Sequence, residues 1–310
     1  MDIYTAWLGY ILRGRFGSTA ALKRAQGKRM VLDGNWYTEA SDTLGLGFSL
    51  RIKDKLHEET SPYQTIAVYE TETFGRLLTI DGLVMLTDRD NFVYHEMMTH
   101  PALFAHGSAK NVVIIGGGDC GTLREVLKHD SVEQATQIEI DERVTRLAEE
   151  YFPALCDSND DPRATLAFED GVAWMKNAPD GSVDLIIIDS TDPIGPAEGL
   201  FNEAFYKQCH RVLGNGGMLV QQSESPLVHS ELIGEMHDGL RNSGFADTQL
   251  LSFPQPSYPT GWWSATLAAR DTRTLYAPQG ELGFETFYYT PAMHNAAFAQ
   301  PAFMARILGG

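Results

Sequence analysis

The sequence predicts an α/β protein in which a small antiparallel β-domain precedes a doubly wound sheet of alternating strands and helices. Apolar runs separated by helical patterns fill the second half of the chain, as expected for buried parallel strands. The region before them alternates with period two, which is typical of half-buried strands. With 310 residues, 43% of them hydrophobic, the chain is long enough for both domains.

Residues 1–33 are expected to form an N-terminal extension outside these domains. Apolar side chains between Trp7 and Leu12 precede a basic run from Arg13 to Arg29, a pattern that favours a short amphipathic helix followed by a polar linker. We expect this segment to pack on a protein partner rather than on a membrane.

The β-domain is predicted over residues 34–91. Phe48, Leu50 and Ile52 alternate with polar residues, so one face of a strand is apolar. Asp81-Gly82 lies between two apolar runs, and this dipeptide favours the type I′ turn of a two-residue hairpin because both positions need positive φ.

Residues 92–310 are expected to form the larger domain, which begins with a helix over residues 92–104. Helical patterns at Leu123–Lys128 and Glu142–Tyr151 separate the predicted strands, and Trp263–Ala268 is expected to close the sheet. The other predicted strands are Val112–Ile115, Thr136–Ile140, Thr165–Phe168, Leu185–Ile188 and Met218–Gln222.

Composition narrows the class of protein. Asp and Glu outnumber Lys and Arg by 41 to 24, and a formal charge of −17 disfavours nucleic acid and anionic membranes as partners. Three cysteines without a CxxC pair suggest neither a disulfide framework nor a zinc site. No run reaches the length of a membrane span and the start lacks the features of a signal peptide, so we expect a cytoplasmic protein.

A glycine-rich loop, Gly116 to Gly121, lies between the strand VVII and a helix, which is the order of a Rossmann-like nucleotide-binding turn. Glu139 ends the next strand 20 residues after Asp119, where an acid suits ribose hydroxyls. A carboxylate at Asp119 would repel a phosphate, so a nucleoside that carries a positive group fits better; a helix N-cap is the alternative role for Asp119.

Acidic residues also follow the next two strands, at Glu169-Asp170 and at Asp189 with Asp192. Open α/β sheets bind ligands beyond the carboxyl ends of their strands, so these acids should converge on one cleft. Crowded carboxylates favour a cationic ligand. His95-Glu96 and His100 resemble a zinc motif, but their spacing of five separates the histidines by about 140° on a helix, so we expect no metal site and interpret them as packing or surface residues.

Taken together, these residues resemble the spermidine synthases, or polyamine aminopropyltransferases, from about Trp36 to Pro301. The resemblance is carried by Trp36, SPYQ (61–64), DGLVMLTDRDNFVYHEMM (81–98), IIGGGDCGTLREVLKH (114–129), IEID (138–141), EDG (169–171), DSTDPIGPAEGLF (189–201), PSYPTGWWS (257–264) and YYTPAMHNAAFAQP (288–301).

The resemblance implies transfer of the aminopropyl group of decarboxylated S-adenosylmethionine to putrescine, giving spermidine and methylthioadenosine, by a homodimer or homotetramer without cofactor or metal. It implies that Asp189 is the catalytic proton acceptor. The implied donor site consists of Gln64, Gly116, Asp119, Glu139, Asp170 and Gly171. The implied acceptor site consists of Tyr94, His95, Asp119, Asp192 and Tyr258, with a looser match at Gln222 and Glu224.

Some alternatives stay open. Cys120 stands where many family members have Gly, which questions the geometry of the loop. Cadaverine, agmatine or spermidine could replace putrescine as acceptor. A methyltransferase would share the glycine loop and Glu139 but not the two acids of DSTDP, and a silent polyamine-binding protein would be expected to lack Asp189 or Tyr94.

Overall fold

The computed structural model describes residues 32, 34–193, 195–272, 275, 278 and 280–309. The chain divides into two compact units, Met1–Trp36 and Tyr37–Gly310. The helix and linker predicted within residues 1–33 lie outside the described residues, apart from Leu32, which is exposed.

The predicted antiparallel β-domain is confirmed as a five-stranded sheet whose strands follow one another in chain order. Each neighbouring pair from β2 to β5 is antiparallel. The strands are β1 (Trp36–Ser41), β2 (Leu46–Thr60), β3 (Thr65–Thr71), β4 (Arg76–Ile80) and β5 (Leu83–Thr87).

The hairpin between β4 and β5 forms at the predicted dipeptide. Asp81 has φ 50° and Gly82 has φ 81°, so both central residues have the positive φ of a type I′ turn. The Asp81 carboxylate also accepts a hydrogen bond from the Thr65 backbone N–H at 2.8 Å, which ties the turn to β3.

The second sheet has seven strands in the order β11-β12-β10-β9-β6-β7-β8. The five strands from β10 to β8 are parallel, whereas β12 and β11 are antiparallel to their neighbours. The strands are β6 (Asn111–Gly116), β7 (Gln134–Glu139), β8 (Ala164–Phe168), β9 (Val183–Asp189), β10 (Leu213–Gln222), β11 (Asp247–Pro254) and β12 (Trp262–Ala269).

One expectation about this sheet was wrong, and one strand was missed. The strand at Trp262–Ala269 does not close the sheet, because β11 pairs outside it. β11 was not predicted, since its first half, Asp247 to Gln249, is polar and half-buried, and its apolar side chains are too few to give a clear period. The Rossmann-like α/β architecture itself is confirmed.

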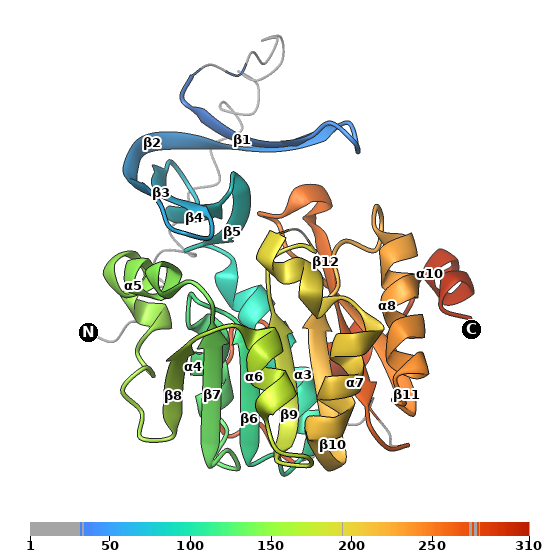
Figure 1. Ribbon diagram of the computed structural model, residues 1–310. Helices are drawn as coiled ribbons and strands as arrows, with labels where there is room; N and C mark the ends of the chain where they lie inside the picture. Colours follow the sequence, from blue (N-terminus) through green and yellow to red (C-terminus); the bar gives the residue numbers. More distant parts are fainter. Residues whose placement is uncertain are drawn as a thin grey trace. The chain divides into compact units, whose positions relative to one another are not determined.

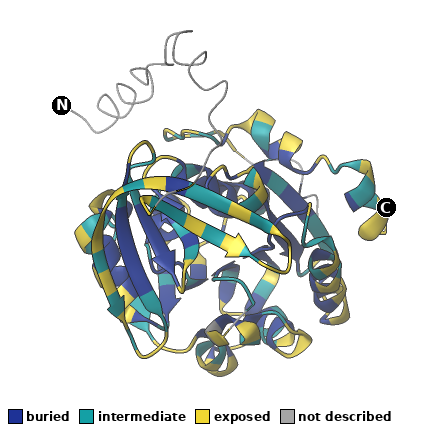
Figure 2. Ribbon diagram, turned by 90° about the horizontal axis from the view of Figure 1, so that it is seen from above, coloured by how far each residue is buried: buried dark blue, intermediate teal, exposed yellow. Residues whose placement is uncertain are grey.

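Helices cover both faces of the seven-stranded sheet (Figure 1). Side chains from α3 and α4 join one core with β6, β9 and β10, while α6, α7 and α8 contribute to a second core on the opposite face. Figure 2 shows buried strands in the interior and helices that expose their outer sides. The helices are α3 (Asn91–His106), α4 (Gly121–Leu127), α5 (Glu142–Tyr151), α6 (Gly171–Asn177), α7 (Glu203–Val212), α8 (Ser230–Asn242), α9 (Pro291–Ala297) and α10 (Ala302–Ile307), with short 3₁₀ helices at Pro153–Leu155, Gly195–Leu200 and Pro259–Gly261.

Within the part of the chain that is described, no helix combines the length and the apolar character needed to cross a membrane.

The register of the central strands brings the predicted acids to one edge of the seven-stranded sheet. Gly116 at the end of β6 pairs with Asp189 at the end of β9, and Glu139 ends β7 on the other side of β6. The carboxyl edge of the sheet is therefore where a ligand site is expected.

Candidate functional site

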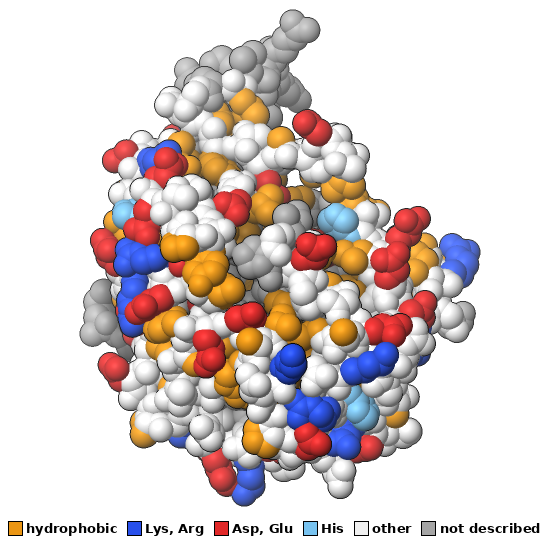
Figure 3. Space-filling view, in the orientation of Figure 1, with side chains coloured by type: hydrophobic (Ala, Val, Ile, Leu, Met, Phe, Trp, Pro, Cys, Tyr) orange, Lys and Arg blue, Asp and Glu red, His pale blue; other side chains and the backbone are white. Residues whose placement is uncertain are grey.

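A cavity opens at the carboxyl edge of β6, β7 and β9, against side chains of the β-domain. Figure 3 shows apolar side chains in the hollow of this face and acidic side chains around it. Of the predicted site residues, the cavity is lined by Gln64, Tyr94, Gly116, Asp119, Glu139, Asp170, Gly171, Asp189 and Tyr258. A second cavity shares Tyr94 and Tyr258 with the first and is lined by Asp192, Gln222 and Glu224.

Asp189 lines the first cavity, directly before Ser190 and Thr191, which line both cavities. The residue is 9% exposed, and its carboxylate accepts a hydrogen bond from the Tyr94 hydroxyl at 2.7 Å and one from the Thr122 hydroxyl at 2.5 Å. Burial raises the pKa of Asp189, and the nearby charge of Asp119 raises it further. A carboxylate with a raised pKa has a stronger affinity for a proton, which suits a proton acceptor.

The glycine loop is held against the backbone of Asp189. The Gly117 N–H donates to the Asp189 carbonyl oxygen at 2.7 Å. Gly116 has φ 84°, and a Cβ there would collide with the same carbonyl oxygen, so only glycine fits. Cys120, the departure from the family pattern, has φ 67° and is fully buried. The loop therefore accommodates this cysteine in a left-handed conformation, with its thiol 3.6 Å from the Gly118 carbonyl oxygen.

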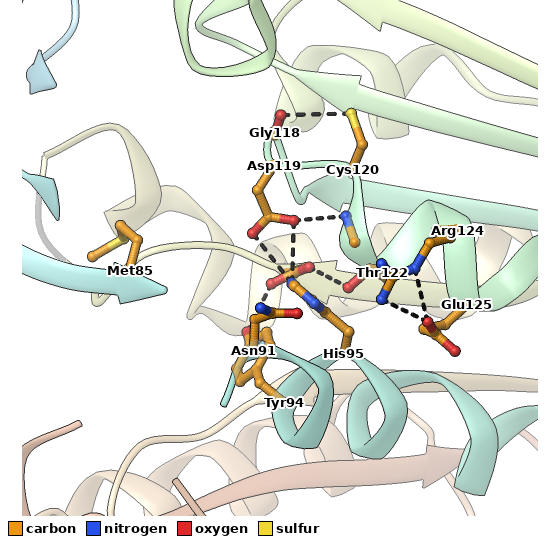
Figure 4. Close-up of polar contacts among 12 residues, drawn as sticks. Met85, Asn91, Tyr94, His95, Gly118, Asp119, Cys120, Thr122, Arg124 and Glu125 are labelled. Carbon is orange, nitrogen blue, oxygen red and sulfur yellow. Dashed lines mark hydrogen bonds and ion pairs between the residues drawn. The ribbon is translucent and has the colours of Figure 1, made fainter. Parts of the chain in front are cut away.

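Asp119 is held from behind by His95, as Figure 4 shows. The His95 Nε2 lies 3.1 Å from one carboxylate oxygen of Asp119 and 3.3 Å from the other. The Gly121 N–H also donates to Asp119 at 2.7 Å, although the N-cap residue of α4 is Cys120 and not Asp119. Burial would raise the pKa of Asp119, but His95 and the Gly121 N–H lower it below the usual value.

Glu139 ends β7, and Asp170 follows the neighbouring strand β8 at the same edge of the sheet. Glu139 is buried and accepts the Asp141 N–H at 2.8 Å; burial raises its pKa to about 7. Asp170 caps α6, because its carboxylate accepts the N–H groups of Val172 and Ala173 at 2.8 and 3.4 Å. Both acids line the cavity, and they can accept hydrogen bonds from hydroxyl or amino groups.

Gln64 reaches the cavity from the turn between β2 and β3. Its amide donates to the Asp141 carboxylate at 3.0 Å, and the Ser61 hydroxyl donates to the same oxygen at 2.6 Å. The other oxygen of Asp141 caps α5 by accepting the Arg143 N–H. Asp141 therefore joins the β-domain to the edge of the second sheet beside Glu139.

Two tyrosines, Tyr94 and Tyr258, line both cavities. The rings of Tyr94 and Tyr258 lie 5.9 Å apart, and Trp263 packs edge-on against Tyr258 at 4.7 Å. The Tyr258 hydroxyl donates to the Met85 carbonyl oxygen at 2.7 Å rather than to an acid of the site. Tyr94 thus contacts the Asp189 carboxylate, whereas Tyr258 lines both cavities without a hydrogen bond to that carboxylate.

Four acids line the second cavity: Glu39 on β1, Asp42, Asp192 and Glu224. Burial raises the pKa of Glu224 well above its usual value, and Asp192 raises it further. Both carboxylate oxygens of Glu224 lack a hydrogen-bond donor, although His229 Nδ1 lies 3.3 Å from one of them outside hydrogen-bonding geometry. A buried carboxylate without a donor is costly, so this cavity favours a cationic ligand.

Tyr94, on α3, lines both cavities, whereas His95 contacts the Asp119 carboxylate and lines neither cavity. Two further polar residues of the same helix, Glu96 and His100, contact other parts of the protein. Glu96 is fully buried and accepts the backbone N–H groups of Phe287, Tyr288 and Tyr289 at 2.7, 2.9 and 2.7 Å. His100 lies 3.1 Å from Glu125 and 3.0 Å from His129.

His95 and His100 are both buried, which agrees with packing residues rather than surface residues, and each also lies beside a carboxylate. Over the described ranges, no group of three or more His, Cys, Asp or Glu side chains could hold a metal ion.

The residues of the site that were not predicted include Thr122, Asp141 and Glu39. Thr122 and Asp141 lie inside quoted motifs, and their positions directly after a glycine loop and a strand end are a signal that could have identified them. Glu39 follows Trp36 by three residues in a strand of the β-domain, and nothing in its neighbourhood in sequence connects it with Asp192 or Glu224.

Known proteins are similar to this chain over most of its length. Residues 91–276 match the model of the spermine/spermidine synthase domain, and residues 35–88 match that of the spermidine synthase tetramerisation domain. The chain is 60% identical over 286 residues to the polyamine aminopropyltransferase of Thioalkalivibrio sulfidiphilus (strain HL-EbGR7), covering 91% of this chain and 100% of the other.

A second relative, the polyamine aminopropyltransferase of Methylococcus capsulatus (strain ATCC 33009 / NCIMB 11132 / Bath), is 60% identical over 276 residues, with 88% and 97% of the two chains covered. Among solved structures, a spermidine synthase in complex with the transition-state analogue AdoDATO is similar with a TM-score of 0.85 and 33% sequence identity, over 93% of this chain and 99% of the other.

Proposed function

The chain belongs to the spermidine synthase family and is a polyamine aminopropyltransferase, and on that premise we propose that it transfers the aminopropyl group of decarboxylated S-adenosylmethionine to putrescine. The products would be spermidine and methylthioadenosine. The observation that carries the proposal is the pair of carboxylates, Asp119 and Asp189, at the glycine loop, where a phosphate-binding protein would not place them.

In the proposed donor pose, the adenosine lies between Glu139 and Asp170, and the aminopropyl chain extends toward Asp119. Glu139 would accept hydrogen bonds from the ribose hydroxyls and Asp170 one from the adenine amino group. Gln64, fixed by Asp141, would close the site from the β-domain. The donor's ammonium would pair with Asp119, whose pKa is below the usual value, so that it is ionised at neutral pH.

The acceptor amine would attack the methylene carbon bound to the sulfonium sulfur. The nitrogen lone pair forms the new C–N bond while the C–S bond breaks, its electron pair stays on sulfur and methylthioadenosine leaves uncharged. Free alkyl amines have a pKa near about 10.4, so the nitrogen must first lose a proton. Asp189, directly before two residues that line both cavities, would accept it, and Tyr94 and Thr122 fix the carboxylate's orientation.

The distal ammonium of the acceptor would occupy the second cavity with Asp192 and Glu224. This assignment is supported by the buried Glu224 carboxylate that has no hydrogen-bond donor. A diamine places one nitrogen at Asp189 and a cation at these acids, which is why putrescine is the proposed acceptor. Glu39 extends the acidic lining from the β-domain.

Product analysis tests the function directly. Purified protein is incubated with decarboxylated S-adenosylmethionine and, separately, with putrescine, cadaverine, agmatine and spermidine, and the products are identified by mass. We expect spermidine and methylthioadenosine with putrescine. Decarboxylated S-adenosylhomocysteine together with a methylated amine would indicate a methyltransferase instead, and turnover with another amine alone would overturn the choice of putrescine.

The donor pose also predicts selectivity against S-adenosylmethionine, which differs from the proposed donor by a carboxylate. None of the described residues that line the first cavity is Lys or Arg, so this carboxylate would lie among negative groups. Like charges in a partly desolvated cleft cost several kcal/mol, and about 1.4 kcal/mol is a tenfold preference. Competition at equal concentrations should favour the decarboxylated donor by at least about a hundredfold.

Residues 35–88 match a tetramerisation domain, and we infer that the protein is a homotetramer. Light scattering coupled to size-exclusion chromatography tests this state. A mass of one or two 34.3 kDa chains would contradict it.

A further inference from the structure

Asp119 has two sides that differ in what can reach them. Its side chain is 17% exposed and lines the first cavity, whereas the His95 side chain behind it is 1% exposed and does not line that cavity. A ligand therefore contacts Asp119 from the cavity, and His95 contacts it from the protein interior. When His95 is protonated, Asp119 has an imidazolium on its inner side and, in the proposed donor pose, an ammonium on its cavity side.

Few other positive charges are close to this site. Arg124, on α4, pairs with Glu125 at 2.9 Å, and Lys128 pairs with the same carboxylate at 2.6 Å. The charged and titratable groups that face His95 are Asp119 and Arg124 from the glycine loop and α4, Asp189 from the end of β9, and Tyr94 on its own helix.

We propose that His95 carries the positive charge that balances Asp119 while the cavity is empty, and that it releases its proton to water when the donor's ammonium binds Asp119. The identity of the donor rests on the proposed function. His95 is then a positioning residue whose charge changes when the ligand binds, because the donor's ammonium replaces the imidazolium as the cation beside Asp119.

The surroundings of the His95 ring make its charged form depend on Asp119. The Nδ1 atom is buried without a hydrogen-bond partner, so a protonated ring has one N–H that no acceptor satisfies. The ring also lies against Gly121, where a Cβ would collide with it, so the ring is tightly confined there. Burial lowers the pKa of His95, but the charges of Asp119 and Asp189 raise it above the usual value.

A second cation at Asp119 removes that compensation. An ammonium a few Å from the imidazolium repels it and partly neutralises the carboxylate that held the proton, so the bound state favours neutral His95. Neutral His95 still donates from Nε2 to Asp119. Donor binding should therefore tighten as pH rises, by up to about tenfold per pH unit, and level off above the pKa that His95 has in the empty protein.

Calorimetry measures the released proton. The decarboxylated donor is titrated into the full chain, between about pH 6 and pH 9, in buffers of different ionisation enthalpy, and the dependence of the heat on the buffer gives the number of protons released. Methylthioadenosine, which lacks the ammonium, is the matched ligand. Glu139 would contact the ribose of both ligands, so the donor-minus-methylthioadenosine difference cancels its titration.

Variants separate His95 from Asp189. In the wild type we expect the donor to release up to one proton more than methylthioadenosine. His95→Gln, which can still donate to Asp119, should abolish this difference and flatten the extra pH dependence of the donor's Kd. Asp189→Asn should retain the difference. A difference that persists in His95→Gln and disappears in Asp189→Asn would assign the proton to Asp189 and overturn the proposal.

A spectroscopic measurement on the wild type does not depend on a variant's folding. With ¹⁵N-labelled histidine, one imidazole should change from charged to neutral on addition of the donor and stay charged with methylthioadenosine; no such change overturns the proposal. Failure of the proposed function looks different, because then neither ligand binds or no aminopropyl product forms. Donor binding with product formation but without extra proton release refutes only the role of His95.

Discussion

On α3, Glu96 and His100 differ from Tyr94 and His95 in how their buried polar groups are satisfied. Glu96 and His100 are surrounded by protein partners: three backbone N–H groups for the carboxylate, and Glu125 with His129 for the ring. Tyr94 and His95 instead contact carboxylates whose other side faces a cavity. Polar groups that the protein satisfies by itself stabilise the fold, whereas those satisfied on one side only are available to a ligand.

The largest expected effect is on the cavity side. Asp189→Asn should fold and lower kcat by about a hundredfold or more, because the amine loses its proton acceptor. Its stability at pH 7 should be equal to or above that of the wild type, since a buried carboxylate with a raised pKa costs folding free energy when ionised. Steady-state kinetics and urea unfolding measure the two quantities.

Asp184→Asn is the matched control, because Asp184 lies on the same strand, where it accepts the N–H groups of Lys110 and Asn111 away from the cavities. It should keep near-normal turnover. Near-normal turnover of Asp189→Asn as well would remove Asp189 from its proposed role.

A substitution at Glu96 should instead lower stability and leave substrate binding unchanged. Glu96→Gln replaces one acceptor oxygen with an NH₂ group facing backbone N–H donors, so the variant should lose about 1–3 kcal/mol of unfolding free energy. Because Glu96 lines neither cavity, the folded variant should keep its KM values. Urea denaturation with Glu142→Gln, an exposed helical glutamate, as control measures the loss; unchanged stability would contradict the anchoring role.

Glu224 provides a second test of this comparison, because it is buried like Glu96 but its carboxylate accepts no hydrogen bond from the protein. Glu224→Gln should lower kcat/KM for putrescine by about tenfold, the size of one charge-assisted hydrogen bond, and leave the KM of the donor unchanged. Its stability should not fall. A variant that loses stability and keeps its acceptor kinetics would identify Glu224 as a structural residue.

The smallest expected effect is the pH dependence of methylthioadenosine binding. Glu139 has a pKa near about 7 in the empty site, and ribose hydroxyls donate to its ionised form. Affinity should therefore fall as pH drops through 7, by about tenfold or less between pH 8 and pH 6. Isothermal titration checks this. In Glu139→Gln the profile should be flat, and an equally steep profile in that variant would assign the titration elsewhere.

Sequence reasoning worked best where topology leaves little choice. Strand ends that carry acids had to meet at one edge, so the convergence of Asp119, Glu139 and Asp189 could be predicted from the order of strands alone. Contacts between distant segments could not be predicted: Thr122 reaches Asp189 across 67 positions, and Gln64 reaches Asp141 across 77. The strand β11 was missed for a related reason: its first residues are polar, and its formation depends on pairing with β12 in the tertiary structure.

Other expectations are not tested by the fold. The roles of the individual site residues, the domain boundaries at residues 33 and 91, a metal-free reaction and a cytoplasmic location stay predictions. Each concerns a ligand, a boundary or an environment rather than the path of the chain.

The anchoring of Glu96 also bears on how the protein is made. Its three backbone partners lie 191, 192 and 193 positions further along the chain, so the carboxylate beside Tyr94 and His95 stays without them until residues 287–289 have been synthesised. Such distant contacts form late, because closing a long loop costs entropy. A nascent chain can thus build the β-domain and most of the sheet while α3 still lacks this anchor, and we expect the enzyme to become active only after its C-terminal segment has left the ribosome.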